Sequence, residues 1–530
     1  MSEVKNLSDI KKSLIAEINK RVEDKVLEPT NAQLLEKLIN NADSDTEAIN
    51  IAALGTTYKR TGLHFDKRLE KISSDIHYFK KNNDLSFFTE GNKTVNKLII
   101  GENYHALQNL LIQYKGKIDV IYIDPPYGKD SMGEFAQTNY KNNITRDNLL
   151  SMLYSRLQLA KELLSDSGVI FCSIDDRNQA YIKCLFDEVF GERNFITEFI
   201  RKTKSMTGDD GNGLNIQHEY LICSAKDKSI AFMHGEDKDY SDYSNPDNDP
   251  NGEWCSADPS AKSGGETLYY PIKNPYTEKV DYPPQGRYWA FSKDTLIQYI
   301  KEGRIKFKEK YPSNQRGFIF KRYKKQGKNA VNSLFAIDNV FMNQNATIEA
   351  MNIFGERLFD YPKPIQFVSK VIEYSSKPNS IILDFFAGSG TTGHAVLELN
   401  KKDGGNRQFI LCQLNEKTDT TPNGIAYDVT SKRLKRIMTG ECYDGTKDFK
   451  WIEDNEKYGG NLDVYELETV SNKETTAGKS AFEVIDETLY GKKKFETLKE
   501  KIDWVCQNFY RTQTGVESDE QWQERIKQGK

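Results

Sequence analysis

Short apolar runs alternate with helical stretches along much of this chain, and the alternation stops and later resumes. Residues 97–100 and 117–123 are apolar runs of strand length, and each is followed by a helical pattern. Such alternation is typical of a mostly parallel sheet with helices on both faces. It stops near residue 200 and resumes near residue 355. The sequence therefore predicts an α/β fold that is interrupted by an inserted domain.

We expect five regions along the chain. They are an N-terminal helical region (1–60), the first part of the sheet domain (61–200), the inserted domain (201–345), the second part of the sheet domain (346–440) and a polar C-terminal region (441–530). The N-terminal region has one apolar stripe, because apolar residues recur every four positions. Its members are Ile10, Leu14, Ile18, Val22 and Val26. We expect this stripe to pack on the main body or on a second subunit.

Composition excludes several classes of protein. The net charge of -4 over 530 residues gives no general attraction to nucleic acid, so any basic surface must be local. The seven cysteines form no C-x-x-C pair and the six histidines show no ligand spacing. These patterns argue against a disulfide framework and a metal site. No run of 18 apolar residues and no leader is found, so we expect a cytoplasmic protein without membrane association.

The tetrapeptide Asp124-Pro125-Pro126-Tyr127 directly follows the apolar run 117–123. It therefore lies at the carboxyl end of a predicted strand, the edge where open α/β sheets bind ligands. Neither proline can donate a backbone hydrogen bond, so their carbonyls remain acceptors. Two acceptors beside an aromatic ring suit the amino group of a nucleobase. The motif predicts a site for chemistry on an exocyclic amine; the alternative is a stiff turn without a catalytic role.

A second motif, with Gly388, Gly390 and Gly393 in G-x-G-x-x-G spacing, follows the apolar run 381–386 and opens a helical pattern. Glycines let a ligand approach the backbone, and a helix N-terminus presents free N–H groups. Glu416, at the end of the next predicted strand, can accept hydrogen bonds from ribose hydroxyls. These features fit an adenosine-containing cofactor, either a dinucleotide or S-adenosylmethionine. The alternative is a tight turn without a ligand.

The amine-binding motif decides between the two cofactors. A hydride-transfer enzyme has no use for that turn, whereas an enzyme that aligns an amine with a methyl sulfonium does. Asp124 and the carbonyl of Pro125 would hold the amine protons, so that the nitrogen lone pair points at the methyl group. Tyr127 would hold the base by stacking. The two motifs together favour methyl transfer to a nucleobase.

Residues 301–330 are strongly basic, with eleven Lys or Arg against two Glu. Aromatic residues are interleaved with these cations. Cations neutralise phosphates and aromatic rings stack on bases, so the mixture favours a DNA-facing surface over an ordinary solvated face. The candidates for DNA contact are Arg316, Lys321, Arg322, Lys324 and Lys325.

Together, these motifs and their order resemble the beta-class amino-methyltransferases of DNA, in which the amine-binding motif precedes the cofactor motif by circular permutation. The similarity extends to the Mod subunits of Type III restriction–modification systems and covers roughly residues 60–440. The segments that carry it are 98–111, 117–128, 154–180, His218-Glu219-Tyr220, Tyr361-Pro362-Lys363-Pro364 and 383–394. The resemblance implies a Rossmann-like methyltransferase sheet, with the region 201–345 as the target-recognition domain.

The resemblance also implies roles for single residues. The turn Asp124-Pro125-Pro126-Tyr127 would bind the amine and support catalysis. The residues implied at S-adenosylmethionine are Glu102, Asn103, Lys363, Phe386, Gly388, Ser389, Gly390, Thr391 and Glu416. Glu102 and Asn103 would lie near the cofactor adenine, although the family more often has Asp where Glu102 stands. Lys363 would start the helix that covers the methionine end.

The implied function is methyl transfer to N6 of a flipped-out adenine in double-stranded DNA. Asp124 supports adenine, because the relatives that methylate cytosine N4 usually have Ser there. Cytosine-N4 methylation remains the first alternative. A DNA-binding specificity subunit without catalysis is the second, and a Rossmann oxidoreductase is the third. The resemblance implies a homodimer and a restriction (Res) subunit as a further partner. The chain ends sooner than the larger Mod proteins, which leaves the second partner open.

Overall fold

The computed structural model divides the chain into two compact units, Met1–Asp66 and Lys67–Lys530. The structure describes residues 8–23, 27, 29–55, 75–89, 94–127, 146–206, 208, 213–236, 238–325, 327–336, 339–470 and 480–510. Within this part of the chain, none of the helices has the length and apolar character needed to span a membrane.

The first unit contains the helices α1 (Asp9–Glu23), α2 (Pro29–Asn41) and α3 (Asp45–Gly55). Their small core consists of Ile18, Ala32, Ile39, Ala42, Ala48 and Ala52. Part of the predicted stripe contributes to this core, since Ile18 is buried and Leu14 and Val22 pack against it, whereas Ile10 is exposed. Contrary to our expectation, the stripe thus packs on helices of its own unit. Val26 lies outside the described residues.

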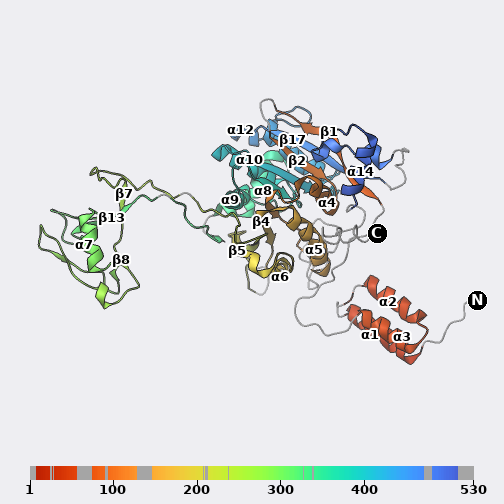
Figure 1. The fold of residues 1–530 in the computed structure, drawn as a ribbon, viewed down its shortest axis with the longest axis horizontal. Coiled ribbons are helices and arrows are strands. Elements are labelled where there is room, and N and C mark those ends of the chain that lie inside the picture. The colour runs from red at the N-terminus through yellow and green to blue at the C-terminus, as the bar shows by residue number, and fades with distance from the viewer. Residues whose placement is uncertain are drawn as a thin grey trace, which may run out of the picture. The chain divides into compact units, whose positions relative to one another are not determined.

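The second unit is built on a ten-stranded sheet (Figure 1). In spatial order the strands are β1 (Ile76–Phe87), β17 (Asn461–Val470), β2 (Val95–Ile100), β16 (Gln408–Gln413), β15 (Ile381–Asp384), β3 (Ile118–Ile123), β4 (Leu164–Ile174), β6 (His218–Ala225), β5 (Phe195–Lys202) and β14 (Leu334–Phe335). The six strands from β17 to β4 are mutually parallel, while β1 and β6 run antiparallel to their neighbours.

The helices cover both faces of this sheet (Figure 1). The chain passes from β3 through α5 (Arg146–Leu163) to β4, and from β15 through α10 (Thr391–Asp403) to β16. These crossovers lead in opposite directions along the sheet, so their right-handedness places α5 and α10 on opposite faces. The boundary between β15 and β3 is therefore a topological switch point. The predicted α/β fold is confirmed.

Further helices complete each layer. Helices α4 (Asn103–Tyr114) and α6 (Gln179–Phe190) pack against α5. On the other face, α9 (Ile365–Ser375) packs against α10, and α8 (Asn343–Phe354) packs against α11 (Lys432–Thr439). The central strands read as continuous apolar runs because both of their faces are buried.

The predicted insertion contains two kinds of structure. Its central part has a core of its own, consisting of Tyr270, Ile272, Trp289, Phe291, Ile305 and Phe318. The elements there are β7 (Trp254–Ser256), β8 (Ser260–Ala261), β9 (Ile272–Lys273), β10 (Val280–Asp281), β11 (Tyr288–Trp289), α7 (Lys293–Lys301), β12 (Ile305–Phe307) and β13 (Phe318–Tyr323). By contrast, β6 and β14 also fall within 201–345 but belong to the main sheet. The part of the insertion that folds around its own core is thus shorter than the range 201–345.

The C-terminal region completes the sheet rather than standing apart from it. Strand β17 lies between β1 and β2, so a segment that the sequence left without a role occupies a position inside the sheet. The remaining elements are α12 (Trp451–Asp454), α13 (Ala481–Val484), α14 (Leu498–Asn508) and five short helical turns: Glu192–Asn194, Glu266–Leu268, Asn339–Phe341, Ala426–Ser431 and Glu487–Tyr490.

Candidate active site

The two sequence motifs meet at the switch point of the sheet. Strands β3 and β15 are parallel neighbours, with Val120 opposite Ile382 and Ile121 opposite Leu383. Neighbouring strands lie about 4.8 Å apart, so the turn after β3 and the loop after β15 emerge side by side at the same edge. Ligands of open α/β sheets bind at such a point. Two segments that are far apart in the sequence therefore form one candidate site.

The turn after β3 is held together by charged hydrogen bonds. The hydroxyl of Tyr127 donates to Oδ1 of Asp124 at 2.9 Å. Nζ of Lys363 donates to both oxygens of Asp124 at 2.7 Å and to the hydroxyl of Tyr127 at 3.0 Å. Burial and the carboxylate of Asp124 raise the pKa of Tyr127 well above its ordinary value, so the phenol keeps its proton. Both prolines are buried, which fixes the turn.

Lys363 thus contacts the amine-binding turn, and the place at the cofactor that the resemblance implied for it stays a prediction. Pro364 caps α9, so Lys363 lies just before this helix rather than in its first turn. In the same segment, the ring of Phe359 lies against the glycine loop, since a Cβ added to Gly388 would be 3.2 Å from Cζ of Phe359. The segment from Phe359 to Lys363 therefore touches both halves of the site.

The glycine loop after β15 needs glycine at two positions. Gly388 has a φ of 52° and Gly390 a φ of 79°, a region that other residues rarely adopt. The N–H of Gly388 donates to Oε1 of Gln413 at 2.7 Å, and the hydroxyl of Thr430 donates to the carbonyl of Gly388 at 2.7 Å. The loop is thus fixed by the end of β16 and by the segment before α11.

The buried side chain of Arg433 donates hydrogen bonds to the glycine loop. Nη1 of Arg433, whose side chain is 1% exposed, donates to the hydroxyls of Ser389 at 3.2 Å and Thr391 at 3.1 Å. The resemblance implied both residues at the cofactor; their hydroxyls bind Arg433, and their contact with a cofactor stays a prediction. Phe386 is half-buried at the start of the loop, and its ring lies 5.3 Å from that of Phe385.

Asp384 ends β15 and organises the same loop. Its Oδ1 accepts the N–H of Phe386 at 2.9 Å, and its Oδ2 accepts the hydroxyl of Thr392 at 2.5 Å. Burial raises the pKa of Asp384 to about 7, although the bonds from Thr392 and Phe386 lower it, and Asp124 raises it further. The side chain of Asp384 at the switch point thus stabilises the conformation of the glycine loop.

Glu102 and Asn103 begin α4 beside the glycine loop. Glu102 is the N-cap of α4, where its Oε2 accepts the N–H of Tyr104 at 2.7 Å, and its Oε1 accepts a bond from Arg156 at 2.5 Å. Nδ2 of Asn103 donates to the carbonyl of Phe385 at 2.8 Å. Both residues therefore lie at the carboxyl edge of the sheet, and their contact with a cofactor adenine stays a prediction.

Glu416 follows the end of β16 by three residues, at the same edge of the sheet as the glycine loop. Its carbonyl accepts the N–H of Ile425 at 2.9 Å, which closes the loop around it. Glycines with positive φ and a carboxylate after the next strand are the features that an adenosine-containing cofactor needs. The residues present therefore fit such a cofactor, while the contact of Glu416 with ribose stays a prediction.

The cations predicted to contact DNA are mostly bound within the insertion. Lys321 is 3% exposed, and its Nζ donates to Asp247 at 2.7 Å and to Asp249 at 2.5 Å. This burial corrects the prediction, because a buried and neutralised ammonium cannot reach a phosphate. Its position on β13, between β12 and β7, directs it inward.

The other four candidates remain closer to the surface. Arg316 lies 3.6 Å from Asp258, and Lys324 pairs with Glu253 at 2.7 Å. Nε of Arg322 donates to the hydroxyl of Tyr243 at 3.0 Å. Arg322, Lys324 and Lys325 are exposed. Their contact with DNA stays a prediction, and Lys325 is an exposed candidate whose side chain has no ion pair or hydrogen bond to a described residue.

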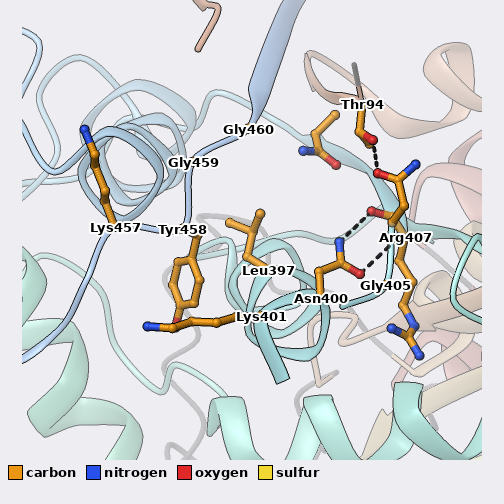
Figure 2. A pocket seen from close by; sticks show the side chains of 12 residues that line it. Thr94, Leu397, Asn400, Lys401, Gly405, Arg407, Lys457, Tyr458, Gly459 and Gly460 are labelled. Atoms are coloured by element: carbon orange, nitrogen blue, oxygen red, sulfur yellow. Dashed lines mark hydrogen bonds between the residues drawn. The ribbon is translucent and has the colours of Figure 1, made fainter. Parts of the chain in front are cut away.

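Figure 2 shows the residues that line a pocket. Its volume is about 290 Å³, and none of its lining residues belongs to either motif. Its walls come from the loops that precede β2, β16 and β17, and from the end of α10, so it lies at the amino edge of the sheet. The residues that line it are Thr94, Asn96, Leu397, Asn400, Lys401, Gly405, Asn406, Arg407, Lys457, Tyr458, Gly459 and Gly460. The side chain of Asn400 bonds the backbone of Arg407, so part of the polar lining is already used. The pocket is separate from the candidate site.

Within the described ranges, no group of three or more His, Cys, Asp or Glu side chains is placed to hold a metal ion. The seven cysteines are free thiols, and four of them are buried.

Comparison with known families shows to which family the chain belongs. A family described as DNA methylase matches residues 118–420, more than half of the chain, and both motifs lie within that range. The chain belongs to this DNA methylase family. A second family, described only as an uncharacterised conserved protein, matches residues 3–120.

Three curated relatives are similar over most of the chain. The StyLTI Mod subunit of a Type III restriction-modification enzyme from Salmonella typhimurium is 30% identical over 75% of this chain and 64% of its own length. The EcoPI Mod subunit from Escherichia phage P1 is 29% identical over 66% of this chain and 63% of its own. The Type II methyltransferase M.KpnI from Klebsiella pneumoniae is 30% identical over 72% of this chain and 97% of its own length. The chain thus spans less than two thirds of the two Mod subunits.

Several residues of the site were not singled out from the sequence. Gln413 and Asp384 each end a strand next to the glycine loop, and that position was an available signal. Arg156 and Arg433 lie inside helices, where nothing in the sequence distinguishes them from surface cations. Glu219 was quoted within a motif, but no role was given to it.

Proposed function

We propose that this protein is an S-adenosylmethionine-dependent methyltransferase that methylates N6 of a flipped-out adenine in double-stranded DNA. The observation that carries the proposal is the carboxylate of Asp124 at the switch point, beside the glycine loop. Membership of the DNA methylase family supports the substrate. DNA as the substrate would place the enzyme in the cytoplasm.

The acceptor side of the reaction follows from the chemistry of the turn. The amine of adenine is a weak nucleophile because its lone pair is delocalised into the ring. Asp124 would accept one amine proton in a hydrogen bond and favour a tetrahedral nitrogen, whose lone pair can then attack the methyl carbon. The bound cofactor would supply a methyl group on a positively charged sulfur. The amine nitrogen would bond to this methyl carbon as the carbon–sulfur bond broke, with the bond electrons left on sulfur, and it would release a proton to solvent.

The two loops would divide the work between cofactor and base. The glycine loop, with Phe386 at its start, would hold the methionine part of the cofactor, and Glu416 would bind its ribose. Tyr127 would stack on the base, and in this structure the ammonium of Lys363 lies 5.1 Å from the centre of its ring. Reactants held in this way need no further ordering in the transition state.

The target base can be tested directly. The full-length protein is incubated with methyl-labelled S-adenosylmethionine and duplex DNA, and the DNA is digested to nucleosides. We expect the label in N6-methyldeoxyadenosine. Label in N4-methyldeoxycytidine would contradict the adenine assignment and favour the cytosine alternative. Cofactor binding without any transfer would instead favour a specificity subunit without catalysis.

The assembly is part of the same proposal. We propose that the chain acts as a Mod-type subunit, forms a homodimer and uses the insertion for target recognition. The similarity to two Mod subunits supports this role. Light scattering of the purified protein tests the dimer, and a monomer at micromolar concentration would contradict it. Co-purification with the product of a neighbouring nuclease gene tests for a restriction subunit.

A further inference from the structure

The motif His218-Glu219-Tyr220 has no role in the proposed chemistry so far. Strand β6 runs antiparallel to β4, with Tyr220 opposite Ile174 at the carboxyl end of β4. The first residues of β6 therefore lie at the same edge of the sheet as the turn after β3. Glu219, the second residue of β6, is 7% exposed. A buried carboxylate at this edge needs a partner.

Arg201 supplies the first partner. It lies directly opposite Glu219 on β5, and its Nε donates to Oε1 of Glu219 at 2.9 Å. The other guanidinium nitrogens donate to the carbonyl of Phe341 at 2.5 Å and to Oδ1 of Asn343 at 2.8 Å. Arg201 is fully buried, so it is a fixed cation that Glu219 neutralises. Removal of either charge would leave the other uncompensated.

The second partner of Glu219 belongs to the candidate site. Oε2 of Glu219 lies 3.8 Å from Nζ of Lys363, and the hydroxyl of Tyr127 also contacts this carboxylate. Burial raises the pKa of Glu219, but the charges of Arg201 and Lys363 outweigh it and hold that pKa below its ordinary value. Glu219 is therefore an anion in the folded protein.

These contacts form a row of alternating charges. Arg201, Glu219, Lys363 and Asp124 follow one another from the interior of the sheet to its carboxyl edge. The exposed fraction of the side chain rises along the row from 0% at Arg201 to 26% at Asp124. The interior end is fixed, and the outer end, Asp124, is the most exposed member of the row.

The row determines which oxygen of Asp124 remains free to bind a substrate. A carboxylate has about four lone-pair sites, two on each oxygen. Among the described residues, both Tyr127 and Lys363 donate to Oδ1, whereas only Lys363 donates to Oδ2. Oδ2 thus keeps one site for a further donor, such as the amine of the target base. Loss of Lys363 from its place would leave either oxygen free to turn toward the amine.

We propose that Glu219 is a positioning residue, which holds Lys363 so that Asp124 presents Oδ2 to the target amine. This inference rests on the proposed methyl transfer and deepens it. Glu219 does not touch the reacting atoms and acts through Lys363 and Tyr127. The role predicts an effect on turnover that is separable from substrate binding.

The test uses Glu219→Gln in the full-length protein, a change that removes the charge and keeps the shape. We expect kcat for DNA methylation to fall on the order of 10–100-fold, the range for groups that orient a functional side chain from behind. KM for DNA and the Kd of S-adenosylmethionine should stay within about twofold, because the lost interaction acts in the transition state. A kcat equal to that of the wild type would overturn the proposal.

Glu198→Gln is the matched control. Glu198 lies on β5 in the same part of the sheet and accepts a hydrogen bond from Gln179 at 2.6 Å, away from the charge row. This variant should keep kcat within about twofold of the wild type. An equal loss in both variants would show a general effect of weakening the sheet and would also overturn the proposal.

A second variant keeps the proposal testable if Glu219→Gln does not fold. The double variant Arg201→Gln with Glu219→Gln leaves no uncompensated buried charge, so it should keep its thermal transition while kcat stays low. Full kcat in the double variant would contradict the role of Glu219. The wild type separates the two proposals: if it transfers no methyl group, the proposed function fails, whereas an active wild type beside a fully active Glu219→Gln refutes only this inference.

Discussion

Two buried lysines in this protein each lie between two carboxylates, yet they belong to different kinds of region. Lys363 bridges Asp124 and Glu219 at the edge of the main sheet, and Lys321 bridges Asp247 and Asp249 within the insertion. Both ammonium groups are neutralised and nearly inaccessible. Charge and burial therefore do not separate a candidate active site from a structural ion pair.

The carboxylates make the difference. Asp249 accepts bonds from Lys321 and Tyr323 at Oδ2, and from the backbone and the side chain of Asn251 at Oδ1. These bonds use all of its about four lone-pair sites, and its side chain is 4% exposed. Asp124 keeps one site that no described residue occupies, and its side chain is 26% exposed. A carboxylate with a free, accessible acceptor can bind a substrate, whereas a saturated one only holds the fold.

The largest effect should follow from removal of the accessible carboxylate. We expect Asp124→Ala to lower the rate of methyl transfer by about 10³–10⁴-fold, as loss of a catalytic carboxylate does elsewhere. The Kd of S-adenosylmethionine should change little, because the glycine loop is intact. Single-turnover assays and calorimetry measure the two quantities. Normal methylation by this variant would contradict the distinction between the two aspartates.

The ion pair of Lys321 with Asp249, whose acceptor sites are all used, should affect stability rather than methyl transfer. We expect Lys321→Met to reduce the free energy of unfolding of the insertion by about 3–5 kcal/mol, because Asp249 would lose its buried counterion. Lys306→Met is the control, since Lys306 pairs with the same Asp247 at 2.8 Å but is 52% exposed, and it should cost less than about 1 kcal/mol. Limited proteolysis of the full-length protein measures both. Equal resistance of both variants would refute the structural role of Lys321.

A third carboxylate, Asp384, refines the comparison through its pH dependence. Its pKa is raised by burial to about 7 in the folded protein, so the folded state favours the protonated form and stability is lost as the pH rises from about 4 to 7. Asp384→Asn should therefore gain stability relative to the wild type over this range, by at most about 4 kcal/mol. Urea denaturation at pH 5 and pH 8 measures the difference. The same difference at both pH values would contradict the raised pKa.

The smallest effect concerns DNA affinity. We expect Lys325→Gln to reduce the slope of log K against log salt by about 0.9, the effect of one lost phosphate contact. Under conditions in which its insertion stays folded, Lys321→Gln should leave the slope unchanged, because the ammonium of Lys321 does not reach the surface. Fluorescence anisotropy at several salt concentrations measures both slopes. A reduced slope for Lys321→Gln alone would return that residue to the DNA-facing surface.

The same contrast explains which features the sequence could predict. The strands and the two loops were predictable, because each is a local pattern of apolar residues, prolines or glycines. The proximity of the two loops depends on the pairing of β3 with β15, a strand order that was not predicted from the sequence. The bond between Lys363 and Asp124 joins residues 239 positions apart, and the bonds of Lys321 reach across 74 and 72 positions. No local pattern specifies such pairs.

The insertion contains a local pattern whose prediction was wrong for one residue. A basic stretch with aromatic residues predicted a DNA-facing surface, but strand pairing turned Lys321 inward. In a strand, alternate side chains point to opposite faces, so one register decides which cations are buried. That register depends on β7 and β12, which pair with β13 from other parts of the chain.

A crystal structure with S-adenosylmethionine bound tests the central claim most directly. The claim is that the turn after β3 and the loop after β15 form one methyl-transfer site. We predict that the methionine part lies on the glycine loop from Phe386 to Gly390, with its methyl group facing the carboxylate of Asp124. A cofactor bound in the pocket at the amino edge of the sheet, or with its methyl group turned away from Asp124, would contradict this account.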